Sequence, residues 1–172
     1  MLRLVSTAGL LALVSTATEI TKARLTTHTA TTSAPTDVVW RLMSTPASWP
    51  SFDPRVSRVE GTTSSGVIGA HLMAVSRMAG LRIPVDVDQA HTGQAVEVTA
   101  HLLPGLREHA EHRVVTTATG GTKIVSQVRA EGVFAAAGAI PVWVSAEVVV
   151  RLLAWRAGKE HRRTERRTER SA

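Results

Sequence analysis

The strongest constraint on the fold is a change of hydrophobic period along the chain. Three segments alternate apolar and polar residues with a period of two: 82–89, 95–102 and 122–131. In the first of them, Ile83, Val85 and Val87 fall on one face and charged residues fall on the other. Such alternation is typical of antiparallel strands with one buried and one solvated face. We therefore predict a sheet with one wet face, and Pro84 indicates an edge strand or a bulge.

Beyond Gly132 the chain becomes almost continuously apolar, from Val133 to Trp155. The length of this run and its Leu and Ala content favour a long helix over a strand. Glu147 and Arg151 stand four residues apart, which places an ion pair on the outer face. The opposite face, which we expect to meet the sheet, holds Val142, Ser145, Val149, Leu152 and Leu153. The residues leave open whether a cavity or a solid core lies between helix and sheet.

The segment before the sheet reads as a strand followed by helices. Leu25 to Thr31 is rich in Thr and predicts the first strand. Ser33 stands where a helix cap is expected, and Pro35 follows in the first turn, so we predict a helix from Pro35 to Met43. Three later prolines, Pro46, Pro50 and Pro54, permit only a short second helix at 47–52. A strand is expected after them, at 56–60.

Length and composition indicate one domain. The chain has 172 residues, 44% of them hydrophobic, which is enough for one sizeable core and too few for two ordinary domains. We expect a leader at 1–23, a ligand-binding domain at 24–160 and an Arg/Glu-rich tail at 161–172. Cysteine is absent from the sequence, which excludes disulfides, thiolate nucleophiles and Cys-based metal sites.

The leader has the outline of a weak signal peptide. Arg3 precedes an apolar stretch at 4–17, which is too short to span a bilayer, a task that takes about 20 residues. Only one basic residue stands before this stretch, and several Ser and Thr residues dilute it. We expect an unstructured leader or a misassigned start, and hence a cytoplasmic protein; secretion is the alternative. No other segment predicts stable membrane insertion.

Charge is concentrated at the C-terminal end. The formal net charge is +6, and residues 159–170 supply half of this excess, with six Lys or Arg against three Glu. The tail either extends the long helix or stays disordered. Aromatic residues make up only 3% of the chain, and the strands direct both acidic and basic residues outward. We therefore expect no nucleic-acid partner, because single-stranded nucleic acid is bound on wide basic surfaces with stacking aromatics.

The histidines do not predict a metal site. His109-Ala-Glu-His112 lacks the spacing of the zinc-binding His-Glu-x-x-His motif, and residues three apart on a strand point to opposite faces. His112 shares a face with Ala110 and Val114. Two interpretations stay open: an imidazole inside a cavity that moves a proton or orients a ligand carbonyl, and a histidine bonded to a neighbouring strand.

Four short motifs in order carry a resemblance to a known family. Val39-Trp40 on the first helix precedes Trp49-Pro50, and three further features follow: Gly66-Val-Ile-Gly69, His112-Arg-Val-Val with Gly121-Thr122-Lys-Ile, and Gly132. Over about 25–163 the chain resembles the START-like (SRPBCC) superfamily, in particular its polyketide cyclase/dehydrase and lipid-transport branch. The low aromatic content, the leader and the Arg-rich tail depart from the pattern of that family.

The resemblance implies an α+β helix-grip fold: a curved seven-stranded antiparallel sheet wrapped around a long C-terminal helix, with two short helices after strand 1. It also implies a cavity for an apolar ligand between sheet and helix. Ser126 and Ser145 are candidate anchors for the ligand's polar end. The candidate cavity residues are Val85, Val98, His112, Val114, Ser126, Val128, Val142, Ser145, Val149 and Leu153.

Three functions follow as hypotheses. The first is binding or carriage of a hydrophobic or amphipathic small molecule, such as a lipid, an isoprenoid or a polyketide-like compound. The second is a polyketide cyclase/dehydratase, with His112 as the weak candidate for a catalytic proton carrier. The third is a structural or stress-associated module with a filled core. We expect no metal and no cofactor, and the sequence does not indicate an oligomeric state.

Overall fold

The computed structural model describes residues 25–61, 69–78 and 80–171, and for 136–144 it describes the backbone alone. The leader at 1–23 lies outside the described residues. So do residues 66–68 of the Gly66–Gly69 motif and the side chain of Val142, one of the candidate cavity residues.

The chain forms seven strands and three helices within its described part. Strand β1 (Thr26–Thr32) leads to helix α2 (Thr36–Ser44) and to a 3₁₀ helix, η1 (Pro46–Ser51). Six strands follow: β2 (Val56–Gly61), β3 (His71–Ser76), β4 (Arg82–His91), β5 (Ala95–Leu103), β6 (Leu106–Thr116) and β7 (Thr122–Glu131). Helix α3 (Ala135–Glu169) completes the fold, so residues 161–169 extend the long helix.

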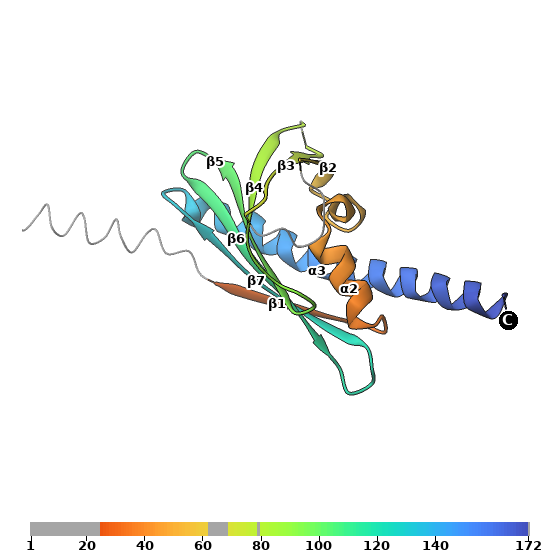
Figure 1. Ribbon diagram of the computed structural model, residues 1–172. Coiled ribbons are helices and arrows are strands. Elements are labelled where there is room, and N and C mark those ends of the chain that lie inside the picture. Colours follow the sequence, from red (N-terminus) through yellow and green to blue (C-terminus); the bar gives the residue numbers. More distant parts are fainter. Residues whose placement is uncertain (1–24, 62–68, 79, 172) are drawn as a thin grey trace, which may run out of the picture.

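The strands make one antiparallel sheet in the order β1-β7-β6-β5-β4-β3-β2. Its register shifts in three places, between Val56 and Arg58, between Val87 and Gln89, and between His101 and Leu103. Bulges of this kind bend and twist a sheet. The curved sheet wraps around α3, and α2 packs against the same helix (Figure 1). The α+β helix-grip architecture expected from the sequence is confirmed.

The core lies between the concave face of the sheet and one side of α3. Along β7, every second residue from Thr122 to Ala130 is buried, as the alternating sequence predicts. Helix α3 buries a stripe against them: Ala146, Val149, Val150, Leu153, Ala154 and Ala157. None of the helices in the described segments is both long enough and apolar enough to cross a membrane.

Gly132 fixes the join between the sheet and α3. Its φ is 108°, in the region that favours glycine, and a Cβ atom there would lie 2.3 Å from the carbonyl oxygen of Gly105. Only glycine allows the chain to pass so close to the β5–β6 turn. On β1, His28 Nδ1 lies 2.9 Å from Glu147 Oε2 and ties this edge strand to the helix.

Two local expectations need correction. Ser33 is not the cap of α2: Pro35 holds that position, and no side chain caps the helix, while the Ala34 amide donates to Thr32 Oγ1 at 3.3 Å. Strand β4 is internal and not an edge; the alternative, a bulge in this strand, is found between Val87 and Gln89 and not at Pro84. Pro84 nevertheless pairs only with Met73 of β3, because the pairing of β4 with β5 begins at Val85.

Candidate functional site

A cavity of about 130 Å³, partly open to solvent, lies inside the curve of the sheet. Three parts of the fold enclose it: strands β3 to β6, the middle of α3, and the segment from η1 to the start of β2. Its strand wall is largely aliphatic: Ala74, Ile83, Val85, Val96, Val98 and Ala100. Helix α3 adds Val149, Val150 and Leu153. The cavity is therefore built to hold apolar groups.

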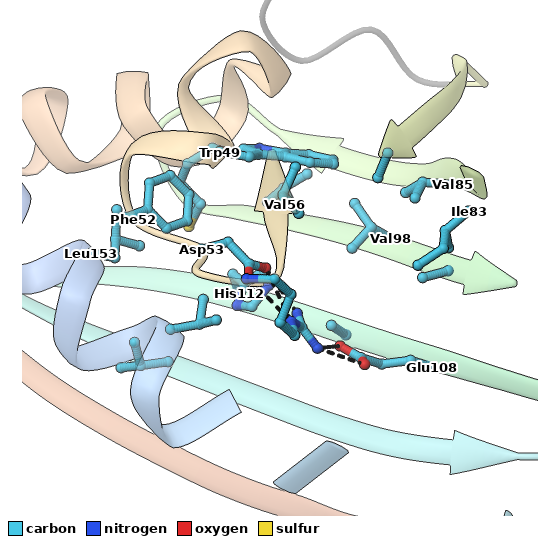
Figure 2. A pocket seen from close by; sticks show the side chains of 18 of the residues that line it. Trp49, Phe52, Asp53, Val56, Ile83, Val85, Val98, Glu108, His112 and Leu153 are labelled. Carbon is cyan, nitrogen blue, oxygen red and sulfur yellow. Dashed lines mark hydrogen bonds and ion pairs between the residues drawn. The ribbon is translucent and has the colours of Figure 1, made fainter. Parts of the chain in front are cut away.

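Two aromatic residues close the cavity from the side of η1. Trp49 and Phe52 line it together with Met43 at the end of α2 (Figure 2). The Trp49 indole Nε1 donates to the carbonyl oxygen of Met43 at 3.0 Å. Because this bond satisfies its N–H, the indole presents an apolar ring to the cavity.

Opposite Trp49 the cavity meets a cluster of charged side chains (Figure 2). Arg55 forms two ion pairs there. Its Nη2 donates to Asp53 Oδ2 at 2.9 Å, and its Nη1 donates to Glu108 Oε2 at 2.9 Å and Oε1 at 3.1 Å. Nη1 also donates to Ser145 Oγ on α3 at 3.1 Å. The guanidinium thus joins the η1–β2 segment to both β6 and α3.

This cluster carries a formal charge of −1, with two carboxylates for one guanidinium. Asp53 and Glu108 are only 7% and 6% exposed. Burial acts to lower the pKa of Arg55, but the nearby carboxylates of Glu108 and Asp53 outweigh it, so the pKa is raised above its ordinary value. Buried charges of this kind are stable only when they are paired, which makes Arg55 essential to both acids.

His112 lies beside this cluster on the inner face of β6. Burial, helped by the positive charge of Arg55, lowers the pKa of His112 from 6.5 to about 4. The imidazole is therefore neutral at neutral pH. Its Nδ1 is buried and has no hydrogen-bond partner among the described residues. Ser126 Oγ and Arg156 Nε share this state, and a hydrogen bond to a bound ligand is one explanation of such a group where it lines a cavity, as His112 does.

Nine of the ten candidate cavity residues have described side chains, and these nine fall into three groups. Five line the cavity: Val85, Val98, His112, Val149 and Leu153. Ser145 is absent from the lining but contacts Arg55. Three others are buried in the core away from the cavity wall: Val114, Ser126 and Val128. Alternation identifies the face of a strand but not the position along it at which the cavity lies, which explains the mixture.

Sequence reasoning missed the charged cluster. Asp53 and Arg55 lie in the short segment between η1 and β2, where the sequence has no periodicity to interpret. Glu108 did leave a signal, because it stands two residues before Ala110 and four before His112, on the same inner face of β6. A carboxylate at a position on the buried face of a strand predicts a buried partner of opposite charge.

His109 lies on the other face of β6, where its Nδ1 is 3.0 Å from Thr99 Oγ1. It is thus separated by the sheet from His112, as the strand period predicts. Within 25–61, 69–78 and 80–171, His, Asp and Glu side chains nowhere gather into a group of three that could hold a metal ion.

The family model described as "Polyketide cyclase / dehydrase and lipid transport" matches residues 24–169. The chain belongs to this family. The match covers every strand and helix described above. No curated protein matches the chain.

Several solved structures share the fold of this chain at low sequence identity. The crystal structure of Ara h 8.0201 is 12% identical, with a TM-score of 0.63, over 78% of this chain and 97% of that one. The di-domain ARO/CYC BexL from the BE-7585A biosynthetic pathway is 15% identical, with a TM-score of 0.65, over 77% of this chain and 46% of that one. Truncated norcoclaurine synthase from Thalictrum flavum is 16% identical, with a TM-score of 0.57, over 77% and 94%.

Proposed function

We propose that the protein binds or carries a small, mostly apolar molecule that has one polar end, and that it does so in the cavity between the sheet and α3. The observation that carries this proposal is the division of the cavity wall. Aliphatic and aromatic side chains form most of it, and the cluster of Asp53, Arg55 and Glu108, with His112 beside it, forms one side. A few convergent polar groups in an apolar pocket are the usual means of orienting a ligand.

The volume limits what enters. An apolar protein cavity of about 150 Å³ holds benzene, and the cavity here is about 130 Å³. One ring, or a short branched chain, therefore fits inside without movement of the wall. A longer lipid, isoprenoid or polyketide-like compound must leave its remainder outside, through the side that is open to solvent.

The charge of the cluster selects the polar end. Asp53 and Glu108 supply acceptor oxygens, and Arg55 is already bonded to both of them. A ligand carboxylate would meet a cluster with formal charge −1 and no unpaired cation. A hydroxyl or phenol donates a hydrogen bond to the same oxygens without this repulsion. The preferred ligand is accordingly a neutral alcohol or phenol.

Isothermal titration with 4-ethylphenol and 4-ethylbenzoate tests this proposal, because the two differ mainly in the charge of one end. We expect the phenol to bind about tenfold more tightly or better. Val98→Phe fills the cavity and should abolish binding, whereas Val115→Phe, at a position 52% exposed on the outer face of β6, is its matched control. Tighter binding of the benzoate would contradict the proposed preference for ligands whose polar end donates a hydrogen bond.

The binding function would be rejected if the protein bound neither compound and also carried no bound small molecule after purification. Native mass spectrometry of protein purified without detergent supplies this second readout. A clean mass together with no uptake of either probe would mean that the family gives this chain its fold and a structural role.

The second candidate function is turnover of the bound compound by cyclisation or loss of water. The observation that favours it is the neutral imidazole of His112 in the cavity wall. With a pKa of about 4, only about one His112 in a thousand is protonated at pH 7. His112 is thus a neutral imidazole at pH 7 that can exchange hydrogen bonds with the ligand, and its low pKa makes it a weak general base. His112→Ala should retain the affinity for ligand and lose turnover; loss of affinity alone would assign His112 to binding.

We also propose a cytoplasmic location, supported by the weak signal outline at 1–23, where a single basic residue precedes the apolar stretch. Fractionation of the expressing cells, with the mass of the N-terminal peptide, tests it. A protein recovered outside the cytoplasm with the leader removed would contradict it.

A further inference from the structure

Helix α3 has an outward face that changes from apolar to basic along its length. At 100° per residue, Trp155, Lys159 and five arginines fall within an arc of about 140°. The arginines are Arg162, Arg163, Arg166, Arg167 and Arg170, and all five are exposed. Val148, 40% exposed, lies about two turns before Trp155, 55% exposed, on the same side. We name these eight residues the α3 basic face.

This face points away from the rest of the protein. The residues of α3 that pack on the sheet, such as Leu153 and Ala157, lie on the opposite side of the helix. The last turns of α3 project beyond the sheet, so the basic end of the helix stands clear of the domain (Figure 1). The face is therefore available to a large partner.

The positive charge of the α3 basic face is not neutralised locally. Two of the three acids on this part of α3 are engaged elsewhere, since Glu160 pairs with Arg41 on α2 and Glu165 lies 3.2 Å from His161 one turn away; the third, Glu169, offsets one of the six positive charges of the face. In the described part of the chain, none of the five arginines forms an ion pair. Lys159 Nζ instead stands 4.9 Å from the centre of the Trp155 ring. The helix thus presents an unbalanced row of guanidinium groups beside an exposed indole.

We propose that the α3 basic face docks on the surface of an anionic lipid bilayer, with α3 lying in the plane of the interface. Helices that bind this interface combine Lys and Arg with an apolar Trp that enters the boundary between headgroups and acyl chains. Clustered Lys and Arg are attracted by the negative surface potential of anionic lipids. Trp155 and Val148 supply the apolar part, and Lys159 with the five arginines supplies the charge.

A depression beside this face adds a place for a lipid headgroup. It lies between the edge strand β1 and α3, and Trp155, Arg162 and Arg151 line it together with residues 31–33 of the chain. Two guanidinium groups, the hydroxyl-bearing segment 31–33 and an indole surround the same open space. Arginine is well suited to phosphate oxygens, which it binds through two parallel hydrogen bonds.

A nucleic acid is the competing occupant of a basic surface, and two observations favour the bilayer. The α3 basic face has one aromatic residue, whereas proteins that bind single strands stack successive bases on several. The rest of the surface is mixed in charge, with acidic partners beside Arg58, Arg82, Arg113 and Arg129. A broad basic footprint is therefore lacking around the helix in the described residues.

Co-sedimentation with sucrose-loaded vesicles tests the proposal on the full chain. Vesicles of phosphatidylcholine with 30 mol% phosphatidylglycerol are compared with pure phosphatidylcholine at 50 and 500 mM KCl. We expect binding to the anionic vesicles only, weakened at high salt. Changing four arginines to glutamine, Arg163→Gln, Arg166→Gln, Arg167→Gln and Arg170→Gln, should lower the partition coefficient about tenfold or more.

The matched control removes the same charge from the exposed arginines of the sheet: Arg58→Gln, Arg107→Gln, Arg113→Gln and Arg129→Gln. It should change partitioning by less than about threefold. Trp155→Ala should abolish the blue shift of tryptophan emission on vesicle binding. Circular dichroism verifies that each variant keeps its helix.

Three outcomes would overturn the proposal. Equal losses in the two fourfold Arg→Gln variants would show that net charge alone drives adsorption. Wild-type protein that fails to bind anionic vesicles at 50 mM KCl would remove the site. Tighter binding to a 20-base-pair DNA duplex than to vesicles, lost in the α3 variant, would assign the same face to nucleic acid.

Discussion

Two charged clusters of similar design lie on opposite faces of the sheet. Inside, Arg55 bridges two carboxylates, Asp53 and Glu108, that are almost fully buried. Outside, Asp86 bridges two imidazoles: His71 Nδ1 lies 2.5 Å from Oδ1, and His101 Nε2 lies 2.8 Å from Oδ2. The outer side chains of His71 and His101 are 85% and 39% exposed. Each central group thus has two partners of opposite type, but the consequences differ, because only the inner acids have lost water as an alternative partner.

The largest expected effect is that of Arg55→Ala. This change leaves two buried carboxylates without their cation, and we expect the free energy of unfolding to fall by about 3 kcal/mol. Urea denaturation measures it. The matched control is Arg58→Ala, whose exposed ion pair with Glu60 should contribute less than about 1 kcal/mol. A loss below about 1 kcal/mol for Arg55→Ala would show that the inner cluster is as weak as an outer one.

The next effect concerns the pH dependence of His112. Its pKa is about 4 in the folded protein, below its ordinary value of 6.5. As the pH falls below 6.5, the unfolded chain gains a proton that the folded chain does not, so stability falls between pH 6.5 and 4. The total is up to about 3 kcal/mol. His112→Gln should remove this part of the slope in a series of urea denaturations, and an unchanged slope would contradict the buried neutral imidazole.

The smallest effect is expected on the outer face. Hydrogen bonds from His101 and then His71 lower the pKa of Asp86 below its ordinary value of 3.8. Its contribution to stability is present above that value and is lost as the pH falls through the lowered pKa. For Asp86→Asn at pH 7 we expect a loss of less than about 1 kcal/mol, reduced further in 1 M NaCl. A loss equal to that of Arg55→Ala would abolish the distinction between the two faces.

The same contrast explains what the sequence could predict. The alternation of Ile83, Val85 and Val87 identified the buried face of β4, because a half-buried strand has to separate apolar from polar residues. The long apolar run after Gly132 identified α3 for a similar reason. Arg55 carries no such signal, because its pairing depends on the turn that brings Asp53 to the guanidinium and on Glu108, which a distant strand supplies. The cavity itself is a gap left where η1, the sheet and α3 fail to fill space, and no local pattern encodes it.

The order of the strands has a further consequence for the time at which the fold closes. Thr26 of β1 pairs with Val128 of β7, about a hundred residues later in the chain. Ribosomes add roughly 5–20 residues per second, so the first strand waits on the order of 5–20 seconds for its partner to be synthesised. Until then β1 has no neighbour in the sheet, since it is an edge strand and β7 is the one strand it pairs with. The nascent chain therefore carries an unpaired, threonine-rich N-terminal strand through most of its synthesis, and threonine limits the adhesion of that strand to other chains because it brings little apolar surface.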